Sequence, residues 1–228
     1  ANSFVPDANS TFFDLCIKSG NTCALTTSTS ADAIIVEPAG KLEITSPATL
    51  NISDSIYLKA DATSYSQFNG DVSLPMVFEM LLQNEGWHLL ASPLLNIDLT
   101  AFEKELNIRY SGDPNLSSAF SWNPTTAKYE AISNNAFNFG ASGMNLYTAD
   151  FLVKTGKGIN NDGNLPVKIQ LKGMSRNGSI TNSSLGYGIA TDYLGPDADG
   201  WNLMMNPYPC AIDLDLVFDA VALPANYQ

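Results

Sequence analysis

The first third of the chain alternates short apolar segments with turns. Residues 33–37 form an apolar run, a Pro-Ala-Gly turn comes next, and residues 41–45 then alternate polar and apolar side chains with a period of two. That period is typical of a strand with one buried face. Similar short segments continue to residue 80. Segments this short cannot cover an apolar face alone, so we expect them to stack on each other, as in a solenoid, or on the later part of the chain.

From Gly86 onward the pattern changes to longer strands and longer loops. Strands are expected near residues 119–122, 128–132, 150–154, 166–171 and 185–191, separated by turns rich in Asn, Asp and Gly. This spacing is typical of a sandwich or jelly roll. We therefore predict an all-β chain, with a solenoid-like N-terminal β region and arm at residues 1–80 packed on a β-sandwich or jelly-roll domain at residues 81–228.

One or two short helices are expected within the second part. Thr100-Ala101-Phe102-Glu103 has the form of a capping box, and Phe102 and Leu106 lie four positions apart on one helical face. These features predict a helix over residues 99–107. Residues 214–221 are compatible with a second short helix.

An internal repeat links two distant parts of the chain. Gly-Trp-His-Leu-Leu-Ala-Ser-Pro at residues 86–93 recurs as Gly-Trp-Asn-Leu-Met-Met-Asn-Pro at residues 200–207, so the two tryptophans lie 201 − 87 = 114 positions apart. In each copy the Trp and the Leu two positions later share a face of a strand, and the proline ends the ladder. We predict a pair of related inner strands whose role is core packing.

These motifs and the short β segments before them resemble modules in the large secreted surface proteins of Bacteroidota, which often use the type IX secretion system. The resemblance covers roughly residues 33–215, and residues 200–209 are its more specific half. It implies an extracellular, β-rich, adhesin-like or gliding-associated module without catalytic residues. Asp54-Ser55-Ile56 is similar to the O-glycosylation site of that phylum, and a plain turn is the alternative.

The chain departs from that pattern in two respects. It carries a single copy of the module, and no recognisable sorting domain comes after Leu223. We expect either that a sorting domain has been removed or that the chain is a subunit that assembles with copies of itself.

The charge of the chain narrows the range of partners. Charged residues make up 15% of the chain, against about 25% in typical soluble domains. The net charge is −12, and both a phosphate backbone and an anionic membrane surface repel such a protein. Nucleic acid is therefore not an expected partner. No run of residues approaches the ~18 apolar positions that a membrane span needs.

The three cysteines indicate whether the protein is located in an oxidising or a reducing compartment. Cys16 and Cys23 flank a Ser-Gly-Asn turn between two strand-like pieces. A disulfide across such a hairpin is geometrically reasonable and implies an oxidising compartment, while two reduced thiols are the alternative. Cys210 lies in an apolar context and is expected to be a buried free thiol.

The sequence shows little sign of catalytic chemistry. His88, the only histidine, lies within an apolar strand, where we expect a hydrogen-bonded or rim-exposed side chain. No Gly-x-Ser-x-Gly elbow accompanies it. Acidic pairs such as Glu79 with Glu85 occur in any chain with 23 acidic residues, so they do not indicate a glycosidase. We predict that the protein is not an enzyme.

Two kinds of binding site are compatible with the sequence. Aromatic platforms that stack on sugars have as candidates Trp122, Tyr129, Tyr147 and Tyr187, with core packing as the alternative. Asp197 and Asp199 resemble the middle of a calcium loop that lacks the first and last acidic ligands. They form either a partial surface site for calcium or a turn whose side chains bond the local backbone. No cofactor other than calcium is indicated.

These observations favour an extracellular, non-catalytic structural or adhesive protein of the bacterial surface. Self-assembly into filaments or a layer would use exposed strand edges, or an N-terminal arm at residues 1–11 that docks on a neighbour. A carbohydrate-binding module for surface polysaccharides is the alternative. A hydrolase ranks third.

Overall fold

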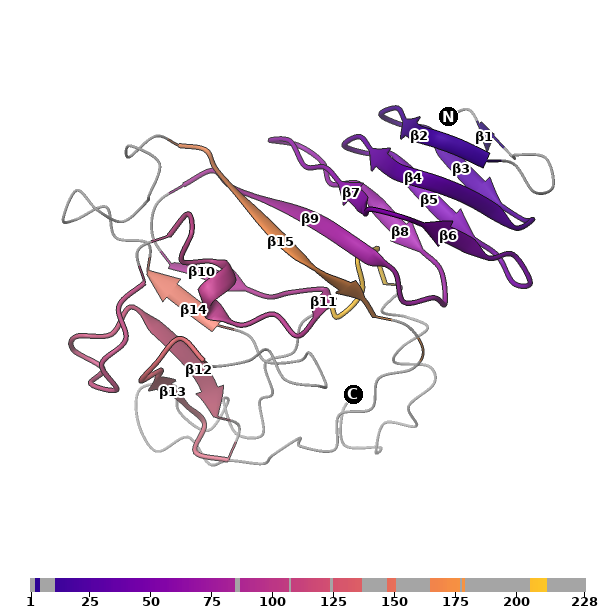
Figure 1. Cartoon of the computed structure of the whole chain (residues 1–228). Helices are drawn as coiled ribbons and strands as arrows, with labels where there is room; N and C mark the ends of the chain where they lie inside the picture. Colours follow the sequence, from indigo (N-terminus) through magenta and orange to yellow (C-terminus); the bar gives the residue numbers. More distant parts are fainter. Residues whose placement is uncertain are drawn as a thin grey trace, which may run out of the picture.

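A computed structural model describes residues 3–4, 11–84, 87–106, 108–123, 125–136, 147–150, 165–176, 178 and 206–212 (Figure 1). Over these residues the chain is all-β, as predicted, and its single helical element is the 3-10 helix η1 (Leu99–Ala101). None of the described segments forms a helix long and apolar enough to cross a membrane.

The N-terminal region is a solenoid of about three turns, in which the chain passes back and forth between two parallel sheets. One sheet contains β1 (Ser3–Phe4), β3 (Thr22–Leu25), β5 (Lys41–Ile44) and β8 (Gln67–Asn69). The other begins with β2 (Thr11–Ile17), β4 (Thr29–Val36), β7 (Ile56–Leu58) and β9 (Pro75–Leu82), and β6 (Leu50–Ile52) pairs with the first part of β4. The expected stacking of short strands is confirmed.

Columns of apolar side chains in register hold the turns together. Ile17, Val36, Leu58 and Phe78 are successive partners across β2, β4, β7 and β9. They recur at nearly equal intervals along the chain, and one turn takes about 20 residues, at the short end of the range for solenoid repeats. The first three members are at most 5% exposed. From the facing sheet, Cys23, Leu42 and Phe68 form a second buried column.

The two sheets differ in width. The first ends at β8, whereas the second continues past β9 with the antiparallel strands β15 (Val167–Ser175) and β11 (Leu94–Leu95). The inner face of these added strands is covered by the end of β10 (Trp87–Leu90) and the residues after it. The residues of this cover that belong to the buried core include Leu90, Ile97, Leu99, Phe102 and Leu106. The predicted boundary between residues 80 and 81 falls inside β9, and the sheet is continuous across it.

The prediction of a helix over residues 99–107 is wrong, because only the 3-10 helix η1 forms among the described residues there. Asp98, and not Thr100, is the cap: its carboxylate accepts a hydrogen bond from the Thr100 backbone N–H at 3.0 Å. After η1 the chain continues as turns and not as regular helix, and a helical element this short depends on tertiary packing for its stability. Phe102 and Leu106 are both buried, which supplies that packing. The second predicted helix, at residues 214–221, lies outside the described residues.

A separate antiparallel sheet has the order β10, β14 (Tyr147–Asp150), β12 (Ala119–Asn123) and β13 (Lys128–Ala131). It contains the first copy of the repeated motif as β10 and confirms the strands predicted near residues 119–122 and 128–132. The strand predicted near residues 166–171 is β15. Residues 185–191 and most of the second motif copy, residues 200–205, lie outside the described part.

We expect Leu58→Ala to lower the free energy of unfolding by about 2–5 kcal/mol, because it leaves a cavity inside a continuous column of side chains. Leu58 is 1% exposed. The measurement is urea unfolding followed by circular dichroism. The control is Leu116→Ala, at a site that is 59% exposed, which should change the same free energy by less than about 0.5 kcal/mol. Equal effects of the two changes would contradict the register of the column.

Candidate functional site

The outermost strand of the wider sheet, β2, is the feature with the clearest capacity for contact. On one side it pairs with β4, and on the other it has no strand partner among the described residues. Its sequence, Thr-Phe-Phe-Asp-Leu-Cys-Ile, contains no proline or lysine and one charge. An unpaired strand edge of this length is a template for another strand, and β2 carries few of the features that normally block such pairing.

The direction of each peptide group in β2 follows from one hydrogen bond. The Ile17 carbonyl accepts from the Glu37 N–H at 2.9 Å, so the peptide groups of Ile17 point toward β4. Polar groups of a strand alternate sides, and therefore those of Leu15 also point toward β4, while those of Asp14 and Cys16 point to the open edge. The strand thus offers N–H and C=O groups to a partner without giving up its internal ladder.

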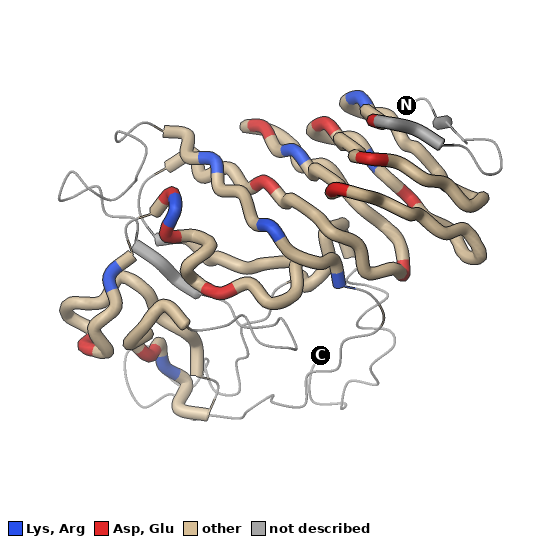
Figure 2. Tube along the Cα trace, viewed as in Figure 1, with Lys and Arg blue, Asp and Glu red and all other residues tan. Residues whose placement is uncertain are grey.

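The side chains of β2 alternate in the same way. Asp14 and Cys16 are exposed, as is Lys18 just beyond the strand, whereas Ile17 is buried in its column. Figure 2 shows charges of both signs at this end of the solenoid. The exposed face of the edge therefore carries an acidic residue, a thiol and a basic residue at alternate positions. When a second copy of this strand runs antiparallel, the acidic residue of each copy can lie opposite the basic residue of the other.

The cysteines correct the predicted disulfide. Cys16 and Cys23 are both free thiols. The Ser-Gly-Asn turn between them does not close a hairpin: it carries the chain from one sheet to the other, so β2 and β3 are not paired. Cys16 is exposed, with Sγ 3.9 Å from Glu37 Oε1, while Cys23 is buried in the core, where burial raises its pKa to about 11. Cys210 is also free, and it is half-buried.

The aromatic candidates for sugar stacking are only partly described. Trp122 and Tyr129 are cross-strand partners on β12 and β13, with ring centroids 5.1 Å apart and planes at 71°. Tyr129 is 46% exposed. The two rings therefore meet edge to face and do not form one flat platform. Tyr147 lies on β14, where its side chain is not described, and Tyr187 lies outside the described residues.

The remaining predicted sites are the glycosylation site at Ser55, the calcium site at Asp197 and Asp199, and the histidine His88. Ser55 is 1% exposed, and its hydroxyl has no hydrogen-bond partner in the described part of the chain, so in the folded chain it is not accessible for glycosylation. Asp197 and Asp199 lie outside the described residues, and the described part has no group of three or more His, Cys, Asp or Glu side chains that could hold a metal. His88 donates from Nε2 to the Asn84 carbonyl at 2.8 Å, as expected for a hydrogen-bonded strand histidine.

Sequence reasoning missed one ionic cluster, which is centred on Glu79. Its carboxylate is 1% exposed and accepts from Lys59 Nζ at 3.0 Å, Lys168 Nζ at 3.1 Å and Gln170 Nε2 at 2.9 Å. The Ala60 N–H adds a fourth bond at 3.3 Å. The signal in the sequence was a single acidic residue inside the apolar run Pro-Met-Val-Phe-Glu-Met-Leu-Leu.

Opposing effects set the pKa of Glu79. Burial alone raises it, but the hydrogen bonds from Gln170, Lys59, Lys168 and the Ala60 backbone together outweigh burial, and the net pKa lies below the ordinary value. The carboxylate is therefore ionised in the folded chain at neutral pH. It joins the end of the solenoid, through Lys59, to the antiparallel strand β15, through Gln170 and Lys168.

Comparison with known proteins identifies one family. The profile of a domain of unknown function, DUF8693, matches residues 1–223, which is nearly the whole chain. No curated protein and no solved structure matches the chain.

We expect Glu79→Gln to lower the free energy of unfolding at neutral pH by about 1–3 kcal/mol, because two lysines lose their shared carboxylate. The folded-state pKa of Glu79 is lowered, so its contribution is present above the ordinary value of 4.5 and is lost as pH falls below it. The difference between wild type and Glu79→Gln should therefore shrink between neutral pH and about pH 3. Urea titrations at several pH values measure it.

The matched control is Glu43→Gln. Glu43 forms an ion pair with Lys41 at 2.5 Å, but both side chains are about a third exposed. Its removal should change the free energy of unfolding by less than about 0.5 kcal/mol at any pH. A Glu79→Gln difference that stays constant with pH would contradict the ionised cluster.

Proposed function

We propose that this chain, which belongs to the DUF8693 family, is a non-catalytic structural or adhesive protein of the bacterial surface that self-associates through the open edge of its solenoid. The observation that carries the proposal is the seven-residue edge strand β2, with its outward peptide groups. The extracellular location rests on the resemblance to secreted Bacteroidota modules, and the acidic charge suits a protein that must stay dissolved outside the cell.

The charges along this edge favour a second copy of the chain as the binding partner. We expect two β2 strands to meet antiparallel, with Cys16 opposite Cys16 at the centre. Asp14 precedes that centre by two positions and Lys18 is two positions beyond it, so each Asp14 lies opposite Lys18 of the second copy. Opposite charges at facing positions stabilise a strand pair, whereas a register with Asp14 opposite Asp14 is repulsive.

Such a contact is symmetric and closes on itself, so it joins chains in pairs. Its product is one continuous sheet that runs through two solenoids. A filament or layer would need a second, different contact in addition to this edge.

The carbohydrate-binding alternative has weaker support. Sugar-binding platforms need exposed rings that present their faces in one plane, and the 71° angle between Trp122 and Tyr129 works against this. Self-association therefore ranks ahead of sugar binding.

We expect Cys16→Pro to raise the dissociation constant of self-association by more than about tenfold, because proline removes an outward N–H in each copy and its ring blocks the edge. The internal ladder to β4 loses no hydrogen bond at this position. Cys16→Ser, the control, keeps the N–H and should associate like the wild type. Light scattering after size-exclusion chromatography measures the association. A wild type that stays monomeric at high concentration, or equal behaviour of the two variants, would overturn the proposal.

A charge swap tests the register. Asp14→Lys places lysines opposite each other and should weaken association, and the double change Asp14→Lys with Lys18→Asp should restore it. Failure of the double variant to recover would exclude this register.

Mild oxidation of the wild type should also give a covalent dimer through Cys16, since opposed residues of a hydrogen-bonded antiparallel pair lie about 5.5 Å apart at Cα.

A further inference from the structure

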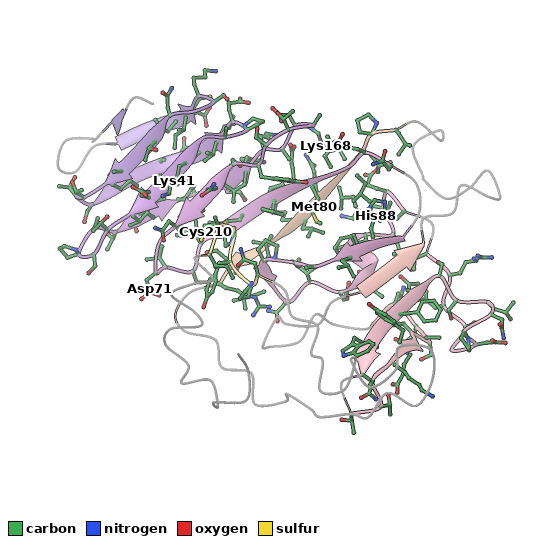
Figure 3. All side chains as sticks on the ribbon, turned by 180° about the vertical axis from the view of Figure 1, so that it is seen from behind. Lys41, Asp71, Met80, His88, Lys168 and Cys210 are labelled. Carbon is green, nitrogen blue, oxygen red and sulfur yellow. The ribbon has the colours of Figure 1, made fainter. Side chains whose placement is uncertain are left out.

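A cavity of about 580 Å³ lies where the narrower sheet of the solenoid ends. Its walls come from the segment before and at the start of β8, the inner face of β9, the end of β10 with the residues after it, and the 206–212 segment. Figure 3 labels two of its lining residues, Met80 on β9 and Cys210 on that last segment.

The cavity follows from the unequal widths of the two sheets. Phe78 is the fourth member of the inner column and Met80 comes two residues later on the same face, but the facing sheet has already ended at β8. The 206–212 segment continues that sheet through a single described bond, from the Phe68 N–H to the Pro209 carbonyl at 2.9 Å. It adds no regular strand there, and space remains between it and β9.

The lining is mainly apolar, and two of its large side chains remain accessible. None of the described residues that line the cavity carries a charge. Tyr65 and Leu89 are 50% and 54% exposed, so both side chains can be reached from solvent. A lining of this kind favours an uncharged ligand with an aromatic or aliphatic body.

One polar group in the lining lacks a partner. Ser66 is 3% exposed and its hydroxyl has no hydrogen-bond partner among the described residues. A buried hydroxyl without a partner is unfavourable, and a ligand that brings a hydrogen-bonding group to it removes that penalty. Two other polar residues of the lining are engaged: the Asn206 amide donates to the Cys210 carbonyl and accepts from the Tyr208 N–H, and the Tyr208 hydroxyl donates to the Gly178 carbonyl at 2.8 Å.

We propose that this cavity is a binding site for a neutral, apolar small molecule that carries one hydrogen-bonding group, with Ser66 as the polar contact and Tyr65 and Leu89 at the entrance. The volume falls within the range of about 300–1,000 Å³ that is usual for small-molecule sites. The site is independent of self-association, because β9 is the fourth strand counted from the open edge at β2.

The test uses N-phenyl-1-naphthylamine, a neutral aromatic amine that fluoresces strongly in apolar surroundings and has one N–H group. The full chain should bind it with a stoichiometry of one. Leu89→Ser should raise its dissociation constant about tenfold, since part of the apolar contact is lost. Leu116→Ser is the matched control, because Leu116 is 59% exposed but does not line the cavity, and it should leave binding unchanged. Equal effects of the two changes would mean unspecific surface adsorption and would overturn the proposal.

Ser66→Ala separates the polar contact from the apolar ones. It should weaken binding of the probe by about threefold while keeping or raising the melting temperature of the free protein, because an unpartnered buried hydroxyl is removed. Unchanged affinity would overturn the role of Ser66.

Thiol labelling locates the probe. In a Cys16→Ser background, Cys210 is the accessible thiol of the chain, since Cys23 is buried. Probe at about five times its dissociation constant should slow the reaction with iodoacetamide about fivefold, and Leu89→Ser should reduce this slowing to less than about twofold at the same probe concentration. Labelling that is indifferent to the probe would place binding elsewhere and would overturn the proposal. None of these measurements depends on the oligomeric state, so failure here and failure of self-association are distinguishable.

Discussion

The apolar columns of the wider sheet need an opposing surface along their whole length, and the narrower sheet supplies it only as far as β8. Up to that point each inward side chain of one sheet is faced by the other sheet, and the solenoid closes its own core. Beyond it, the inner faces of β9 and β15 require a different cover. The η1 region meets that need with Leu99, Phe102 and Leu106, and the 206–212 segment meets it incompletely. The change from a repetitive to an irregular fold is therefore a consequence of sheet width.

The Glu79 cluster lies at the same transition, on the side of β9 that faces away from the columns. Three strands contribute to it or lead into it, since Lys59 directly follows β7 and Gln170 is the β15 residue opposite Glu79. A buried carboxylate is costly unless it is paired, and here four donors share it. Parallel and antiparallel pairing meet at β9, so the cluster fixes the register where this sheet changes from parallel to antiparallel pairing.

Alternation with a period of two reports directly on which side chains face a core, and for that reason the all-β class and the stacking of short strands could be predicted from the sequence. It does not report which strands pair. The turn between Cys16 and Cys23 has hairpin composition, yet each flanking strand pairs with a strand one solenoid turn further along the chain. The capping motif likewise identified the buried face at Phe102 but not the length of the helical turn, which depends on packing. The open edge, the ionic cluster and the cavity all arise from contacts between distant segments, as where Glu79 meets Gln170 across 91 positions.

The column that runs from Ile17 to Phe78 also makes the protein extensible. Every turn repeats the same inward position, so a further turn of the same length, with an apolar residue at the column position, could be inserted between β4 and β7 without altering either end. At present the open edge at β2 and the cavity at β9 are separated by three strand spacings of about 4.8 Å each. Insertion or deletion of turns would lengthen or shorten that separation in steps of one strand. Duplication of the sequence of one turn would therefore change the distance between the open edge and the cavity.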